Sequence, residues 1–293
     1  MKKYIRKRRK AILLLIVIML CAFVGYEFYI SKYHLMTTYY KIQTEKVDQS
    51  VRIVHLTDLH NSEFGKNNAD LIKNVKEQEP DLILITGDLL NSDDKNTDIA
   101  VDLLEQLDKI APVYVSYGNH EEEYESRYGT NLKDVFEDTG AKVLERMYED
   151  IEVNGQKLRI GGIYGYCVPA SFLETDEADE DECAFLSEFQ DTDRYRILLC
   201  HMPYSWIEND AISNWEIDCV LTGHVHGGQI RLPIIGGLYA PDQGLFPGRV
   251  SGRYESKDHE KVMILSRGLG STEKIPRWNN VPEVVTIDIE LED

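Results

Sequence analysis

The chain has 293 residues, 43% of them hydrophobic, and a formal net charge of −19. This composition is ordinary for a globular protein, and a chain of this length can bury a sizeable core. From residue 32 onward there are 25 basic and 50 acidic residues, so no basic stripe is available to neutralise phosphates, which excludes non-specific nucleic-acid binding.

The amino-terminal segment differs from the rest of the chain in charge and hydropathy. Seven of the first ten residues are basic, whereas residues 11–26 are uncharged and rich in Leu, Ile and Val. A bilayer core needs roughly 20 apolar residues, and the aromatic residues at 26–33 suit the membrane interface. We expect a basic cytoplasmic segment at 1–10, an uncleaved single-pass anchor at 11–30 in the cell membrane, and an extracytoplasmic remainder. A cleaved signal peptide and a buried soluble helix are the alternatives.

Strands and helices alternate after the anchor. Residues 31–50 predict a stalk or a first strand, and an Asn154-Gly155 turn predicts a hairpin. The sequence contains no internal repeat and no low-complexity linker, so we expect residues 51–293 to form one layered α/β domain. Predicted strands cover 51–57, 81–86, 112–117, 151–153, 157–163, 196–200, 217–222, 262–266 and 283–290; predicted helices cover 68–79, 97–110 and part of 174–193.

Four cysteines follow the anchor, and none forms a Cys-x-x-Cys motif. Cys200 and Cys219 lie inside apolar runs, which predicts buried free thiols. A disulfide between Cys167 and Cys183 is a second hypothesis, because the expected compartment is oxidising.

Five short polar motifs directly follow predicted strands. In open α/β sheets, ligands bind beyond the carboxyl ends of the strands, so we expect the five motifs to converge on one site. The motifs are Asp58-Leu59-His60, Gly87-Asp88, Gly118-Asn119-His120-Glu121, His201, and Gly223-His224-Val225-His226.

The side chains of these motifs predict a site for two metal ions. Carboxylate oxygen and imidazole nitrogen suit Mn²⁺, Fe²⁺, Zn²⁺ and Co²⁺, and the absence of thiolates argues against a structural zinc site. Seven donors are too many for one tetrahedral ion and suit two ions that share a ligand. Two metals about 3.5–4 Å apart are a common device for cleaving phosphate esters. The predicted ligands are Asp58, His60, Asp88, Asn119, His201, His224 and His226.

In this order the motifs resemble those of the calcineurin-like metallophosphoesterase superfamily. The resemblance covers residues 51–290, and the runs 223–233 and 266–270 are similar to its bacterial, membrane-associated branch. It implies a sandwich of two β-sheets flanked by helices. It also implies a hydrolase that acts on phosphate ester bonds.

The resemblance further implies a role for each residue of the motifs. Asp88 would bridge the two metals, for which Mn²⁺ is the favoured ion, and a water that bridges them would attack phosphorus. His120 matches the catalytic histidine that is not a ligand, and it would protonate the leaving group. One metal would be held by Asp58, His60, Asp88 and His226, and the other by Asp88, Asn119, His201 and His224.

The residues after Asp88 narrow the substrate class. Leu89-Leu90-Asn91-Ser92 stands where the Ser/Thr protein phosphatases of the superfamily carry Asp-Arg, which argues against protein dephosphorylation. The anchor favours an envelope or lipid-linked phosphate ester or pyrophosphate. A nucleotide or another soluble phosphodiester is the alternative substrate, and a non-enzymatic metal-binding scaffold is disfavoured because all seven ligands are present. No residue predicts substrate specificity.

Overall fold

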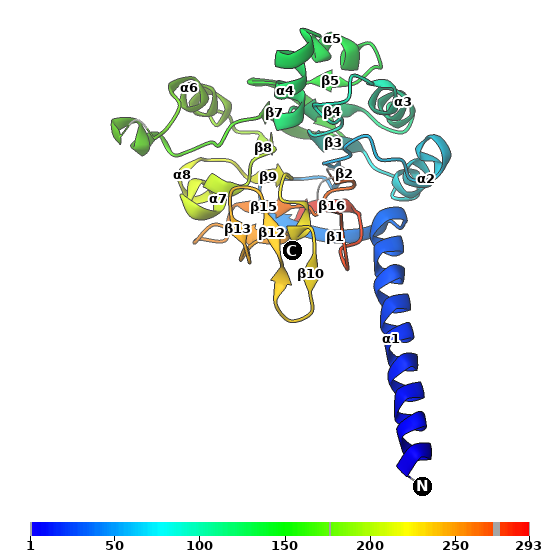
Figure 1. Cartoon of the computed structure of the whole chain (residues 1–293). Helices are drawn as coiled ribbons and strands as arrows, with labels where there is room; N and C mark the ends of the chain where they lie inside the picture. The colour runs from blue at the N-terminus through cyan, green and yellow to red at the C-terminus, as the bar shows by residue number, and fades with distance from the viewer. Residues whose placement is uncertain (1, 176, 272–275, 293) are drawn as a thin grey trace.

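The structure, a computed structural model, describes residues 2–175, 177–271 and 276–292. Two six-stranded β-sheets stack face to face, and helices cover their outer surfaces (Figure 1). This is the layered sandwich that the resemblance implied.

The first sheet has the strand order β1-β16-β2-β3-β4-β5. Strands β2 to β5 are parallel, while β16 is antiparallel to β2 and parallel to β1. All five residues of β3 are buried, as expected for a strand covered on both faces. The strands are β1 (Met36–Thr44), β2 (Val51–Leu56), β3 (Leu82–Thr86), β4 (Val113–Ser116), β5 (Lys142–Val143) and β16 (Glu283–Leu291).

The second sheet has the order β14-β15-β9-β8-β7-β6. Strands β15, β9, β8 and β7 are parallel, and the edge strands β14 and β6 are antiparallel to their neighbours. The predicted turn joins β6 to β7, and Asn154 and Gly155 both have positive φ, as a tight hairpin requires. The strands are β6 (Met147–Val153), β7 (Gln156–Ile163), β8 (Tyr195–Cys200), β9 (Cys219–Thr222), β14 (Gly252–Glu255) and β15 (Val262–Leu265).

Three apolar clusters hold the layers together. One lies between the sheets, and the others lie between each sheet and its helices. The predicted helices at 68–79 and 97–110 are present but shorter at their ends, where helices commonly fray. The outer helices are α2 (Ala69–Glu77), α3 (Asp98–Leu107), α4 (Asn119–Tyr128) and α5 (Leu132–Glu137) on the first sheet, and α6 (Glu180–Phe189), α7 (Tyr204–Glu208) and α8 (Ala211–Asn214) on the second.

Short strands and 3-10 turns connect the longer elements along the chain. Two small antiparallel hairpins lie between β9 and β14. They are β10 (Arg231–Leu232) with β11 (Gly236–Gly237), and β12 (Tyr239–Ala240) with β13 (Gly244–Leu245). The 3-10 turns are η1 (Lys66–Asn68), η2 (Ala170–Thr175) and η3 (His226–Gly228).

One long helix, α1 (Lys2–Tyr33), precedes the sheets and projects away from them (Figure 1). It is long and apolar enough to cross a membrane, as is also true of some signal sequences. Contact with the sheet domain is confined to its carboxyl-terminal part, where Glu27 and Ser31 are buried and the ring of Phe23 lies 6.4 Å from that of Trp278. Only two residues separate α1 from β1.

All five cysteines are free thiols. The hypothesis of a Cys167–Cys183 disulfide is therefore wrong for this structure. Cys167 has a left-handed backbone and its Sγ lies 3.5 Å from Sγ of Cys200 in the core, whereas the thiol of Cys183 contacts the carbonyl of Val168. Cys200 and Cys219 are buried, as predicted.

Candidate metal centre

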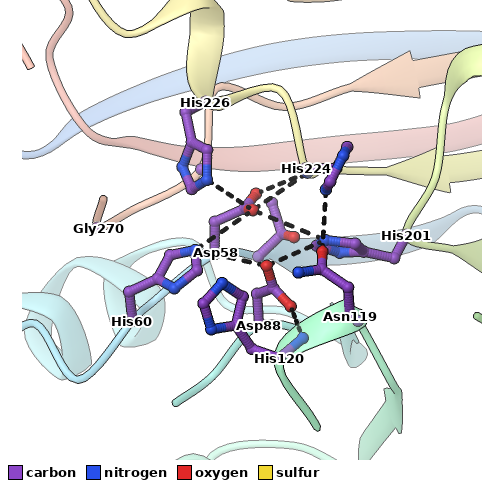
Figure 2. Close-up of polar contacts among 12 residues, drawn as sticks. Asp58, His60, Asp88, Asn119, His120, His201, His224, His226 and Gly270 are labelled. Carbon is purple, nitrogen blue, oxygen red and sulfur yellow. Dashed lines mark hydrogen bonds and ion pairs between the residues drawn. The ribbon is translucent and has the colours of Figure 1, made fainter. Parts of the chain in front are cut away.

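The five motifs converge where the carboxyl ends of strands from both sheets meet (Figure 2). Asn119 and His120 lie in the first turn of α4, a helix that the sequence did not predict. The first sheet contributes Asp58 and His60 after β2, Asp88 after β3, and Asn119 and His120 after β4. The second sheet contributes His201 after β8, and His224 and His226 after β9.

The loops that carry the candidate ligands have unusual backbone conformations. Five of the seven ligands have φ between 47° and 71°, a left-handed region that is unfavourable for residues other than glycine. Gly87 also has positive φ, and a Cβ at this position would lie 2.1 Å from the backbone nitrogen of Gly118. Strain of this kind concentrates at functional sites. The five ligands are Asp58, His60, Asp88, His224 and His226.

Two buried carboxylates form the middle of the cluster (Figure 2). Oδ2 of Asp88 lies 3.2 Å from Nε2 of His201 and 3.5 Å from Nε2 of His60. Oδ1 of Asp58 lies 3.7 Å from Nε2 of His226. Imidazole nitrogens thus face both carboxylates from opposite sides.

Contacts outside the cluster fix the orientation of two histidine rings. Nδ1 of His201 donates to the carbonyl of Thr86 at 2.5 Å, and Nδ1 of His60 donates to Oδ1 of Asn91 at 3.1 Å. Donation from Nδ1 places the lone pair on Nε2, which is the form of imidazole that binds metals.

The unsatisfied atoms of the site match what a metal ion requires. Buried polar atoms in proteins normally have hydrogen-bond partners. Among the described residues, five buried imidazole nitrogens have none, and four of the five belong to predicted ligands. These four are Nε2 of His60, His201 and His224, and Nδ1 of His226; the fifth is Nδ1 of His55 in β2.

The ligand atoms also fall into groups of the size that one ion needs. Those of Asp58, His60 and His226 lie within 4.8 Å of one another, and so do those of Asp88, His201 and His224. A third such group joins His60 and Asp88 to His120. The donor set therefore fits two divalent ions that meet near Asp88. Which atoms bind each ion stays a prediction.

Residues 51–228, more than half of the chain, match the calcineurin-like phosphoesterase family. The chain belongs to this family. It is thus a metal-dependent hydrolase of phosphate ester bonds.

Relatives of this phosphoesterase match over most of their length. An uncharacterized metallophosphoesterase of Bacillus subtilis (strain 168), YkuE, is 26% identical over 274 residues, which cover 90% of this chain and 89% of the relative. The phosphodiesterase YaeI of Escherichia coli (strain K12) is 27% identical over 248 residues, which cover 81% of this chain and 82% of the relative. Among solved structures, the 5′-nucleotidase precursor of Thermus thermophilus is 15% identical with a TM-score of 0.49, over 75% of this chain and 49% of that chain.

Glu121 of the phosphoesterase connects two of the ligand loops. Its buried carboxylate accepts hydrogen bonds from the backbone nitrogens of Asp88 at 2.7 Å, Gly118 at 2.8 Å and Leu89 at 2.8 Å. Burial and repulsion by Asp88 raise the pKa of Glu121 to about 7, and the backbone donors oppose this shift. The sequence places Glu121 in one of the five motifs but does not predict these contacts, because they depend on how the β3 and β4 loops meet.

We expect Glu121→Gln to weaken metal binding by about 10–100-fold, the usual effect of losing a contact behind the ligands. The amide NH₂ would face a backbone donor, so the Asp88 loop would lose its fixed position. Competition with a chromogenic chelator measures the affinity. Glu122→Gln, an exposed neighbour on α4, is the matched control and should bind metal like the wild type. Equal affinities for all three proteins would contradict the role given to Glu121.

His120 lies beside the candidate ligands, with its ring centroid 4.6 Å from that of His60 (Figure 2). The backbone N–H of Ser92 donates to Nδ1 of His120 at 3.0 Å. The ring proton therefore sits on Nε2. Burial lowers the pKa of His120, with Asp88 opposing, and Nε2–H is left available as a donor to a bound substrate.

A buried arginine that no motif indicated supports the loop that covers Asp58. Arg277 donates from Nε to the carbonyl of Gly270 at 2.8 Å and from Nη2 to that of Arg267 at 2.6 Å. The backbone nitrogen of Gly270 donates to the carbonyl of Asp58 at 2.6 Å. Burial lowers the pKa of Arg277 to about 10, opposed by Asp58, so a guanidinium charge lies beside the site at neutral pH.

A cavity of about 640 Å³ connects the site to the end of α1. His60, Asn91 and Arg277 line it on the side of the metal centre, and Phe28 and Tyr33 of α1 line it on the other. A candidate metal ligand and the last turns of the apolar helix therefore share one cavity.

Proposed function

We propose that this phosphoesterase is a membrane-anchored, two-metal phosphodiesterase whose substrate is a lipid-linked phosphate ester of the cell envelope. The observation that carries the substrate class is the cavity shared by His60 and α1. Its polar side would receive the phosphate, and its aromatic side, at Phe28 and Tyr33, would receive the apolar part of the substrate.

The membrane placement is supported by the charge pattern around α1. Basic residues cluster before the apolar run, and positively charged flanks stay on the cytoplasmic side. The acidic domain would then lie outside the cytoplasm with its cavity near the outer surface of the membrane.

The proposed ligand sets share Asp88, and Mn²⁺ is the favoured ion. When bound, the two ions would polarise the phosphoryl oxygens and lower the pKa of coordinated water. His120 would donate from Nε2 to the leaving oxygen, and Arg277 would add positive potential on the cavity side. The sets are Asp58, His60, Asp88 and His226 for one ion, and Asp88, Asn119, His201 and His224 for the other.

The choice of a phosphodiester is supported by one relative, which is named a phosphodiesterase. A non-enzymatic scaffold is disfavoured because the metal-binding side chains are all present. A nucleotide or another soluble phosphodiester is the competing substrate, and the experiment below distinguishes it.

The substrate class is tested with the full-length protein and Mn²⁺ in detergent micelles. We expect kcat/KM for a phospholipid phosphodiester in mixed micelles to exceed that for nucleotides by at least about 10-fold, since remote binding energy raises catalytic efficiency. Phe28→Ser should lower kcat/KM for the lipid and leave a chromogenic phosphodiester unaffected. Tyr26→Ser, an exposed change on the same helix away from the cavity, is the control. Faster hydrolysis of nucleotides than of lipids would favour the competing substrate.

A further inference from the structure

Large apolar side chains are exposed in one short segment of the sheet domain. Outside α1, nine such side chains are exposed among the described residues, and five of them lie in 234–246. The most exposed is Ile234, whose relative exposure is 107%. A grouping this tight marks a surface that contacts something other than water. The five are Ile234, Ile235, Tyr239, Leu245 and Phe246.

The most exposed of these residues lie at the tip of the β10–β11 hairpin. Leu232 pairs with Gly236, so residues 233–235 form the turn. Ile234 has φ of 73°, although a turn at this conformation favours glycine or asparagine and disfavours a β-branched residue. The hairpin thus presents an apolar side chain at a position where both backbone energetics and contact with water favour another residue type.

The base of this hairpin is attached to α1. Trp278 forms a β-bridge with Ile230, and Arg231 donates its backbone N–H to the carbonyl of Trp278 at 3.0 Å. The ring of Trp278 contacts Phe23 of α1, which belongs to the uncharged run 11–26. From this base the hairpin extends in the same direction as α1 runs toward the amino terminus (Figure 1). Its tip therefore points to the side of the sheet domain from which α1 projects.

We propose that the β10–β11 hairpin, with Leu245 and Phe246 beside it, inserts into the outer leaflet of the membrane at the boundary between headgroups and acyl chains. This inference rests on the proposed span of α1 and on no assumption about the substrate. Residues 232–241 carry no charge in an otherwise strongly acidic domain, so anionic lipids would not repel them.

Membrane contact of the hairpin would also affect how the candidate metal centre is oriented, because the hairpin is connected to the site at both of its ends. The hairpin follows η3, which begins at the candidate ligand His226, and its first strand begins at Arg231. The chain returns to the site at Asp242, whose Oδ2 lies 3.2 Å from Nε2 of His224. A second attachment beside α1 would prevent the domain from rotating about the helix. The site would then keep a fixed orientation toward the lipid surface.

The test uses the full-length protein with Cys21→Ser, since the four remaining cysteines are buried. Ile234→Cys is labelled with the fluorophore NBD and reconstituted into vesicles of phosphatidylcholine and phosphatidylglycerol. Doxyl-labelled lipid should quench the probe about twofold, because interfacial apolar groups lie roughly 5–10 Å deep. Met147→Cys is the control, since Met147 is exposed and contacts Lys133 of α5, far from α1 (Figure 1), and its probe should not be quenched.

Each outcome has a defined meaning. An unquenched probe with water-like emission at 234, in protein that floats with the vesicles, would overturn the hairpin contact and leave the span of α1 intact. A blue-shifted probe that lipid does not quench would indicate contact with another protein copy and would also overturn the proposal. Failure of the protein to float would overturn both the span and the contact. Leu245→Cys gives a second, independent position, and no readout depends on activity.

Discussion

Asp88→Asn is expected to abolish phosphodiesterase activity while the protein remains folded. The carboxylate of Asp88 faces the imidazoles of His60 and His201 and accepts a hydrogen bond from the backbone nitrogen of His120. Asparagine has the same shape but lacks the charge that a shared metal ligand supplies. The loss in kcat/KM should exceed the roughly 100-fold that follows removal of a contact behind the ligands.

The matched control is Asp81→Asn, at the opposite end of the same strand. Asp81 accepts hydrogen bonds from the backbone of Arg52 and the side chain of Asn154, and its substitution should leave activity unchanged. Circular dichroism and the thermal midpoint of each variant verify folding. Wild-type activity in a folded Asp88→Asn protein would refute the two-metal assignment.

Removal of metal is expected to abolish activity and to lower thermal stability. Without ions, the site confines Asp58 and Asp88 together with imidazole nitrogens that have no hydrogen-bond partner. Ions that bind only the folded state stabilise it by about 2.7 kcal/mol when the free ion concentration is 100 times Kd. Each kcal/mol of added stability raises Tm by about 2–4 °C for a domain of 150–250 residues.

The measurement combines metal analysis, calorimetry and activity after dialysis against a chelator. Mn²⁺ should restore both Tm and activity, and Ca²⁺, which prefers oxygen ligands, should restore neither. Asp88→Asn should show a smaller increase in Tm on addition of Mn²⁺. Full activity in metal-free protein would contradict the proposal, whatever the substrate proves to be.

The site could be predicted to a large extent because its residues follow recognisable strands. Asp58, Asp88 and His201 each lie within two residues of the end of a mostly buried strand, and the end of a strand places the next side chains at the edge of its sheet. His224 and His226 follow β9 closely, so the end of that strand also places them at the edge of its sheet. These features are local, so a single sequence contains them.

Features that depend on distant contacts could not be predicted. Helix α4 was missed because half of its ten residues are charged and it buries only Glu121 and Tyr124, so it lacks an apolar stripe. The pairing of β1 with β16 joins the two ends of the domain, and Arg277 acts through carbonyl groups that the fold brings to it. The proposed Cys167–Cys183 disulfide failed because side-chain direction, which spacing does not reveal, turns Cys167 toward Cys200.

The short connection between α1 and β1 determines how such an enzyme would meet its substrate. His34 and Leu35 alone separate the helix from the sheet, and two residues span at most about 7 Å. If α1 spans a membrane as proposed, a catalytic domain on so short a connection would stay next to the membrane surface. It would encounter molecules through lateral diffusion within one thin layer, so its turnover in the cell would follow the number of substrate molecules per unit of membrane area.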